Sequence, residues 1–269
     1  MSNSDAHRSL PPLCPGGTGP AFTRRGFLRW STVGLGALAL AGAVGRSDAA
    51  DTGRPADDPA ARTIQLKKDD HILFFGDSLT ALSTGPTGWV TLVREALNTR
   101  HPDLSLRVSS VATGGHKVSN LLERAGRDVL PYVREGAVPH KPTIVFIQIG
   151  VNDAAAGIEA ATFKAQLEEL IGRLRTAGAQ VVLCSLTSLG EKHDGTNRID
   201  PKLEEFASVA RTVAREQKVP LNDLRRAFVE HWKKNNPENK DRGILTYDGN
   251  HFNDAGHRFV AEQMLTKLQ

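Results

Sequence analysis

Short apolar runs alternate with longer amphipathic segments from residue 72 to the end of the chain. The short runs predict strands at 72–75, 104–111, 143–150, 179–186 and 219–224. The longer segments predict helices at 89–100, 118–133, 161–178, 201–218, 223–234 and 254–268. This alternation predicts a parallel sheet with helices on both faces. The near-continuous apolar strands agree, because strands of such a sheet are buried on both faces. The expected fold class is therefore α/β, with three α/β/α layers around a mostly parallel sheet of five strands.

The first 50 residues have the pattern of an export signal. Arg24 and Arg25 precede Gly-Phe-Leu-Arg and a small, apolar run that ends at Val44. This order is typical of a twin-arginine signal that is removed after export, and it predicts a periplasmic or extracellular protein. The alternative is a membrane anchor, but residues 30–44 are only 15 positions, whereas a spanning helix needs ~20. Polar residues 51–64 predict a linker, and residues 65–269 are long enough for one domain.

The net charge and the number of cysteines differ between the whole chain and the part that follows the predicted export signal. The chain has a net charge of +4, but residues 1–50 hold five basic and two acidic residues, which leaves 29 basic and 28 acidic residues. A nearly neutral remainder does not predict a nucleic-acid surface. Cys14 lies in the leader, so Cys184 has no partner for an intramolecular disulfide. Its apolar context, QVVLCSL, predicts a small core residue.

Candidate catalytic residues follow the ends of the predicted strands. Ser78 follows the first strand, Gly114 and Gly115 follow the second, and Asn152 follows the third. In open α/β sheets, ligands bind beyond the carboxyl ends of the strands. A serine in the first turn after a strand can direct its hydroxyl into this crevice, although Ser78 alone also fits a helix N-cap.

A serine nucleophile needs a base, and the chain offers nine histidines. Asp248 and His251 are three residues apart just before the last predicted helix, which begins at Asn253 or Asp254. This spacing lets a carboxylate accept a hydrogen bond from one imidazole nitrogen and leaves the other nitrogen for a hydroxyl. His257 is the rival base, but it lies inside the predicted helix.

Four blocks together resemble the SGNH (GDSL-type) hydrolases. The blocks are FFGDSLT, SSVATGGHKVSNLL, IQIGVNDA and YDGNHFNDAG, and they follow the family's order from Ile72 to Gly256. The second block departs from the family at Ser110, where asparagine is common. The choice of glycine in this block is Gly115, because it keeps the usual distance to the helix leucines, with Gly114 as the alternative.

The resemblance implies a flavodoxin-like fold and a serine esterase. It implies Ser78 as the nucleophile, His251 as the general base and Asp248 as the residue that orients His251. The oxyanion hole would consist of the N–H groups of Ser78 and Gly115 and the side-chain amide of Asn152. No cofactor or metal is expected, since the histidines lack metal-ligand spacing and no phosphate-binding loop is present.

The substrate is predicted only by class. The polar loop at 187–200, which includes Glu191, and the segment at 83–89 are expected to border the crevice. Such polar surroundings favour a short-acyl ester, and the resemblance suggests an O-acetyl group on a glycan. The alternatives are a lysophospholipase or thioesterase of the same fold and a non-catalytic glycan-binding protein. No stable membrane span is expected in the exported form.

Overall fold

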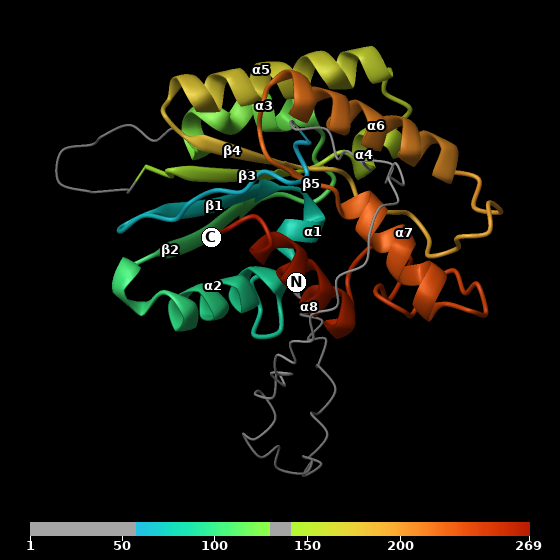
Figure 1. Cartoon of the computed structure of the whole chain (residues 1–269). Coiled ribbons are helices and arrows are strands. Elements are labelled where there is room, and N and C mark those ends of the chain that lie inside the picture. Colours follow the sequence, from blue (N-terminus) through green and yellow to red (C-terminus); the bar gives the residue numbers. More distant parts are fainter. Residues whose placement is uncertain (1–57, 130–140) are drawn as a thin grey trace, which may run out of the picture. The chain divides into compact units, whose positions relative to one another are not determined.

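A computed structural model describes residues 58–129 and 141–269 (Figure 1). The predicted export signal at 1–50 and the first part of the predicted linker, 51–57, lie outside the described residues. The same holds for residues 130–140, which include the end of the helix predicted at 118–133.

A single sheet of five parallel strands forms the centre of the described domain. The strands are β1 (His71–Gly76), β2 (Arg107–Ala112), β3 (Ile144–Gln148), β4 (Gln180–Cys184) and β5 (Leu221–Asn222). Their order is β2-β1-β3-β4-β5, and every neighbouring pair is parallel. This order is that of flavodoxin-like folds, in which the crevice opens between the first and third strands. The predicted α/β fold class is thereby confirmed.

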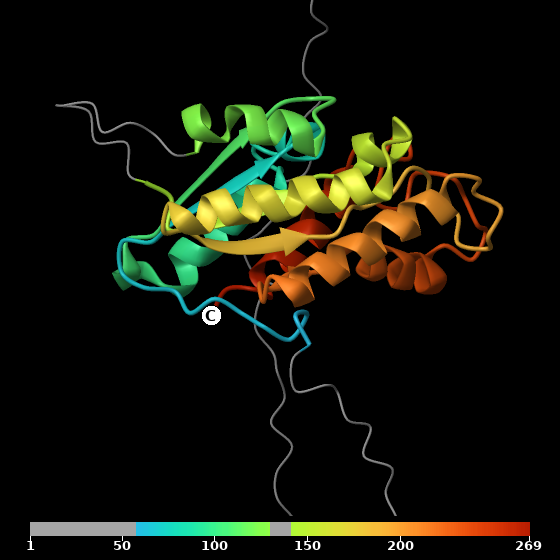
Figure 2. The ribbon, with the colours of Figure 1, turned by 90° about the horizontal axis from the view of Figure 1, so that it is seen from above.

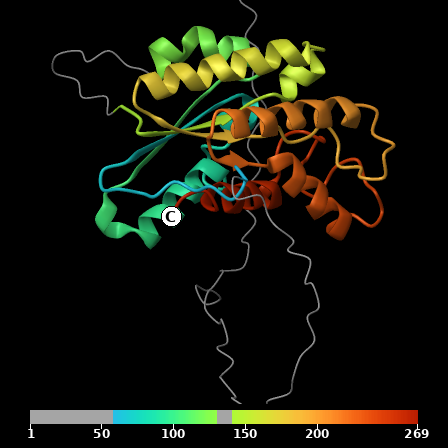
Figure 3. The same cartoon turned by 45° about the horizontal axis from the view of Figure 1, so that its top comes forward.

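Helices cover both faces of the sheet. The longer helices are α2 (Trp89–Arg100), α3 (Val118–Asp128), α5 (Ala160–Thr176), α6 (Asp200–Glu216), α7 (Leu224–Asn235) and α8 (Asp254–Leu265). Figure 2 shows α3 and α5 side by side over the sheet, with α6 next to α5. Figure 3 shows α2, α7 and α8 on the opposite face, where α8 contacts both α2 and α7.

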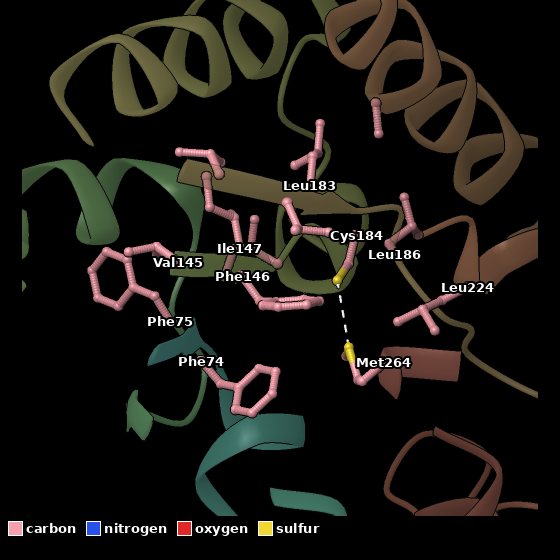
Figure 4. Packing of buried hydrophobic residues seen from close by; sticks show 14 of the residues in the cluster. Phe74, Phe75, Val145, Phe146, Ile147, Leu183, Cys184, Leu186, Leu224 and Met264 are labelled. Carbon is pink, nitrogen blue, oxygen red and sulfur yellow. Dashed lines mark hydrogen bonds between the residues drawn. The ribbon is translucent and has the colours of Figure 1, made fainter. Parts of the chain in front are cut away.

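The alternation of side chains along β1 explains why both faces are covered. All residues from Ile72 to Gly76 are buried. The ring of Phe74 packs edge-on against Trp89 of α2, with ring centroids 4.6 Å apart. The next ring, Phe75, lies on the other face, 4.9 Å below the guanidinium of Arg124 from α3. Figure 4 shows the two rings pointing to opposite sides of the strand.

Cys184 at the end of β4 belongs to this core, as its sequence context predicts. Its Sγ lies 3.9 Å from Sδ of Met264 in α8 (Figure 4). Burial raises the pKa of the Cys184 thiol to about 12. A thiol that stays protonated at neutral pH is a poor nucleophile, so this cysteine has a packing role.

The structure departs from the prediction most clearly before β2 and at two short helices. The strand predicted at 104–111 begins only at Arg107, because Pro102–Leu104 form a 3₁₀ turn and Ser105 has a φ of 50°. Such a left-handed residue cannot continue a strand. Two short helices, α1 (Ser78–Ala81) and α4 (Val151–Ala155), were not predicted. They span about one turn each, which is too short for a periodic pattern.

Residues 58–64 are folded onto the domain, although the predicted linker extends to residue 64. The Pro59 carbonyl accepts a hydrogen bond from Leu221 N–H of β5 at 2.9 Å. Ile64 forms a parallel bridge with Leu268 near the C-terminus. Residues 58–64 therefore pack against the domain that was predicted to begin at residue 65. Among residues 58–129 and 141–269, no helix is both long and apolar enough to cross a bilayer.

Candidate active site

The turn from β1 into α1 presents Ser78 at the carboxyl edge of the sheet. Gly76 is required there, since a Cβ on it would lie 2.4 Å from Thr80 Oγ1 and 2.6 Å from the Gln148 carbonyl. Asp77 is the N-cap of α1, and its Oδ1 accepts a hydrogen bond from Leu79 N–H at 3.0 Å. With Asp77 as the cap, Ser78 is the first residue of the helix, and its hydroxyl is free for another partner.

That partner is His251, which lies 173 residues away in the sequence. His251 Nε2 is 3.1 Å from Ser78 Oγ, and His251 Nδ1 is 2.7 Å from Asp248 Oδ2. Because a carboxylate can only accept, the proton between the last two atoms belongs to Nδ1. In the neutral imidazole with this tautomer, Nε2 is the acceptor for the Ser78 hydroxyl. The structure thus brings together the three side chains that the sequence suggested as a catalytic unit.

Asp248 is held in place by the loop that carries it. Its Oδ1 accepts hydrogen bonds from the N–H groups of Asn250 and His251 at 2.9 and 2.7 Å. Partial burial acts to raise the pKa of Asp248, but the hydrogen bonds from the His251 ring and these two N–H groups outweigh it. The pKa of Asp248 is therefore lowered, which keeps the carboxylate charged beside the imidazole.

The rival histidine, His257, has a different position. It lies in α8, which begins after the N-cap Asn253. Its Nδ1 accepts a long hydrogen bond of 3.4 Å from Trp89 N–H at the start of α2. Burial lowers the pKa of His257. Among the described residues, His251 is the histidine that contacts the Ser78 hydroxyl.

Two of the three predicted oxyanion donors, Gly115 and Asn152, follow β2 and β3, respectively. Asn152 in α4 donates from its side-chain amide to the His116 carbonyl at 2.9 Å, which ties the two loops together. Gly115 has a φ of +75°, a conformation that side chains rarely adopt. The N–H groups of Ser78 and Gly115 have no acceptor among the described residues. The N–H of Gly114 also lacks one there, and a Cβ on Gly114 would lie 3.7 Å from Ser78 Cβ.

Two buried carboxyl groups support this edge of the sheet. Asp153 in α4 is fully buried, and its Oδ1 accepts a hydrogen bond from Val118 N–H at the start of α3. Burial raises the pKa of Asp153 to about 6. Burial, aided by the nearby Asp153, raises the pKa of Asp77 to about 7 against the opposing effect of Leu79 N–H. Near neutral pH, both carboxyl groups therefore carry less negative charge than an ordinary aspartate.

Glu191 does not border the crevice, contrary to the expectation for the loop at 187–200. It is fully buried, and its carboxyl oxygens accept four hydrogen bonds of 2.6–2.9 Å. The donors are the N–H groups of Ile244, Leu245 and Thr246 and the hydroxyl of Thr246. Glu191 thus anchors the segment that leads directly to Asp248, a role that sequence reasoning missed.

A small, largely apolar pocket of about 230 Å³ lies beside His251. Its walls are Leu79, Leu82, Tyr247, His251, Phe252 and His257. The predicted polar border at 83–89 and 187–200 contributes none of these residues. Among the residues that the structure describes, no group of three or more His, Cys, Asp or Glu side chains is arranged to hold a metal ion.

Comparison with known proteins agrees with this fold. Residues 74–259 match the model of the GDSL-like lipase/acylhydrolase family. The chain is 26% identical over 209 residues to the isoamyl acetate-hydrolyzing esterase 1 homolog of Rattus norvegicus, covering 70% of this chain and 77% of that protein. It is 28% identical over 146 residues to an arylesterase of Vibrio mimicus, covering 52% and 68%, respectively.

Solved structures of acetyl xylan esterases are also similar. The crystal structure of AlAXEase has a TM-score of 0.67 and 34% identity, and the match covers 73% of this chain and 98% of that one. Axe2 of Geobacillus stearothermophilus has a TM-score of 0.65 and 23% identity, covering 76% and 96%, so this likeness concerns the fold. The fold and the matched region define an α/β carboxylic ester hydrolase. The chain belongs to the GDSL-like lipase/acylhydrolase family.

Proposed function

We propose that this esterase hydrolyses short-acyl esters, in particular O-acetyl groups on carbohydrates, through Ser78, His251 and Asp248. The observation that carries the proposal is the continuous hydrogen-bonded chain from the Ser78 hydroxyl through both nitrogens of His251 to Asp248. The N–H groups of Ser78, at the start of α1, and of Gly115, after β2, have no acceptor among the described residues. A hydroxyl, a base and unpaired donors at one point are the requirements of acyl transfer.

The reaction proceeds in two halves. Ser78 Oγ attacks the ester carbonyl carbon while His251 Nε2 takes the hydroxyl proton, and Asp248 stabilises the imidazolium. The oxyanion accepts hydrogen bonds from the N–H groups of Ser78 and Gly115 and from the Asn152 amide. His251 returns the proton to the leaving alkoxide, and an acyl-enzyme and a free alcohol result. Water, deprotonated by His251, then attacks the acyl-enzyme and releases the acid and Ser78.

Two relatives support a short acyl group. The AlAXEase structure, 34% identical, is that of an acetyl xylan esterase, and the rat relative carries a name that refers to an acetate ester. A lysophospholipase or thioesterase that accepts long acyl chains is the alternative. A non-catalytic glycan-binding role is not retained, because the family is one of acylhydrolases.

Two substrates that differ only in acyl chain length test this proposal. The protein should hydrolyse 4-nitrophenyl acetate with a kcat/KM at least about 100-fold above that for 4-nitrophenyl palmitate, because an acyl site that fits an acetyl group rejects the longer chain. The two esters share their leaving group, so the ratio reports the acyl side alone. A ratio near one, or a preference for palmitate, contradicts the short-acyl proposal and favours the long-chain alternative.

The role of Asn152 is tested by removing its amide. Asn152→Ala should lower kcat about 10²–10³-fold with little change in KM, because the bond to the oxyanion forms mainly in the transition state. Steady-state kinetics on 4-nitrophenyl acetate measures both constants.

Asn120→Ala is the matched control for the Asn152 experiment. Asn120 Oδ1 accepts a hydrogen bond from Lys117 N–H at 3.0 Å, so this variant loosens the same loop without removing an oxyanion donor. Its kcat should fall far less than that of Asn152→Ala. Equal losses in both variants, or a loss in KM alone for Asn152→Ala, contradict the assignment of Asn152.

A further inference from the structure

Two large apolar side chains are exposed at the mouth of the pocket beside His251. Leu82 is 56% exposed and Tyr247 is 59% exposed, and they are the only exposed large hydrophobic residues in the part of the chain that the structure describes. Exposed apolar side chains gathered at one place mark a binding surface, whereas scattered ones do not. Here both line the same pocket.

The pocket combines an apolar floor with an aromatic wall. Leu79 and Phe252 are 2% and 5% exposed and belong to the core. The Tyr247 ring lies nearly parallel to the His251 imidazole, with an interplanar angle of 19° and centroids 5.9 Å apart. A ligand in the pocket therefore contacts the side chains of Tyr247, Leu82 and His251 at the same time.

The chemistry of His251 decides which half of an ester enters this pocket. Nε2 must return its proton to the leaving oxygen, so the alcohol departs on the His251 side of the reacting carbon. The oxyanion donors Gly115 and Asn152 lie on the loops after β2 and β3, and neither lines the pocket. The pocket therefore receives the alcohol half of the substrate.

We propose that Tyr247 determines specificity by stacking on a ring of the substrate alcohol, and that this ring is a sugar. This inference rests on the proposed function and names the part of the substrate that the pocket recognises. One face of a pyranose ring consists of C–H groups, which suit the Tyr247 ring and Leu82. Its hydroxyl edges would remain at the open mouth, in contact with water. A volume of about 230 Å³ suits a single ring better than an extended chain.

A pair of acetate esters that differ only in the alcohol tests this proposal. The kcat/KM ratio of xylose tetraacetate to methyl acetate is measured for the unmodified protein and for variants of Tyr247. Tyr247→Ala should lower the ratio about fivefold, mainly through KM for the sugar acetate, because an aromatic contact of this kind contributes about 1 kcal/mol. Tyr247→Phe keeps the ring and should keep the ratio. Leu82→Ala removes the facing side chain and should lower the ratio in the same direction.

Each other outcome contradicts a specific step. If Tyr247→Ala slows both acetates equally, the tyrosine acts through the orientation of His251 and not through the alcohol. If 4-nitrophenyl acetate loses activity but xylose tetraacetate does not, the ring recognised is an aryl group. If the unmodified protein hydrolyses xylose tetraacetate and Tyr247→Ala leaves the ratio unchanged, this inference alone fails. If the unmodified protein hydrolyses neither acetate, the proposed function fails first. Unchanged thermal midpoints exclude unfolding as the cause.

Discussion

Ser78→Ala and His251→Ala are each expected to reduce ester hydrolysis by about 10⁶-fold, and the double variant should be little worse than either one. The reason is that the two side chains act as a unit, joined by the hydrogen bond of 3.1 Å between Nε2 and Oγ. Without Ser78 there is no oxygen to acylate, and without His251 nothing removes its proton. Steady-state rates on 4-nitrophenyl acetate for the two single variants and the double variant measure this non-additivity.

Asp248→Asn should retain more activity than either of these variants. An asparagine at this position keeps the shape of the side chain but does not stabilise the imidazolium, and it can favour the wrong tautomer of His251. His251 is still present, however, and can act as a poorly oriented base. The residual rate should therefore lie between those of the unmodified protein and His251→Ala.

The thermal midpoints of these variants decide whether a lost rate reflects chemistry. The side chains of His251 and Asp248 are 26% and 38% exposed and lie at the crevice, so the variants should remain folded. Substantial turnover by a folded Ser78→Ala protein contradicts the nucleophile assignment. If His257→Ala loses all activity and His251→Ala does not, the base is His257 in α8.

The fold could be predicted from the sequence because its strands are buried on both faces. The apolar run at 72–75 lies within β1, and the helix predicted at 89–100 matches α2 at both ends. The pattern failed where structure depends on a few residues without periodicity. It missed α1 and α4, which are four and five residues long. It also placed residues 104–106 in a strand, because the positive φ of Ser105 cannot be recognised from the pattern of apolar residues.

Some features of the candidate site could likewise be predicted from the sequence, and others could not. The location of Ser78, Asn152 and the pair Gly114 and Gly115 could be predicted, because strand ends in a parallel sheet meet at one edge. The choice of Gly115 depended on the family resemblance. The pairing of Asp248 with His251 could be predicted from their local spacing. The polar loop at 187–200 gave no hint that Glu191 is buried, because its hydrogen-bond donors lie more than 50 residues further along the chain. The apolar pocket was also missed, since Leu82 and Tyr247 come together only in the folded chain.

Glu191→Ala is expected to lower both the stability and the kcat of the protein. The variant leaves three backbone N–H groups and the Thr246 hydroxyl without their acceptor in a buried place. One such unsatisfied group costs about 1–3 kcal/mol, so the free energy of unfolding should fall by about 3 kcal/mol or more. The segment at 244–246 leads directly to Asp248, so its loosening should disturb the hydrogen bond between Asp248 and His251. Denaturant unfolding and kinetics well below the thermal midpoint measure the two effects separately.

Two further variants separate a positioning role of Glu191 from a purely structural one. Glu191→Gln retains one carbonyl oxygen, which can still accept from Leu245 and Thr246, so it should recover part of the lost kcat. Asp194→Ala removes an exposed carboxylate of the same loop, whose oxygen accepts hydrogen bonds from Thr196 and not from the segment at 244–246. That control should leave kcat unchanged. If Glu191→Ala is less stable but keeps its full kcat while folded, the carboxylate supports the fold alone. A fall in kcat that Glu191→Gln partly reverses assigns to Glu191 the position of the loop that carries Asp248 and His251.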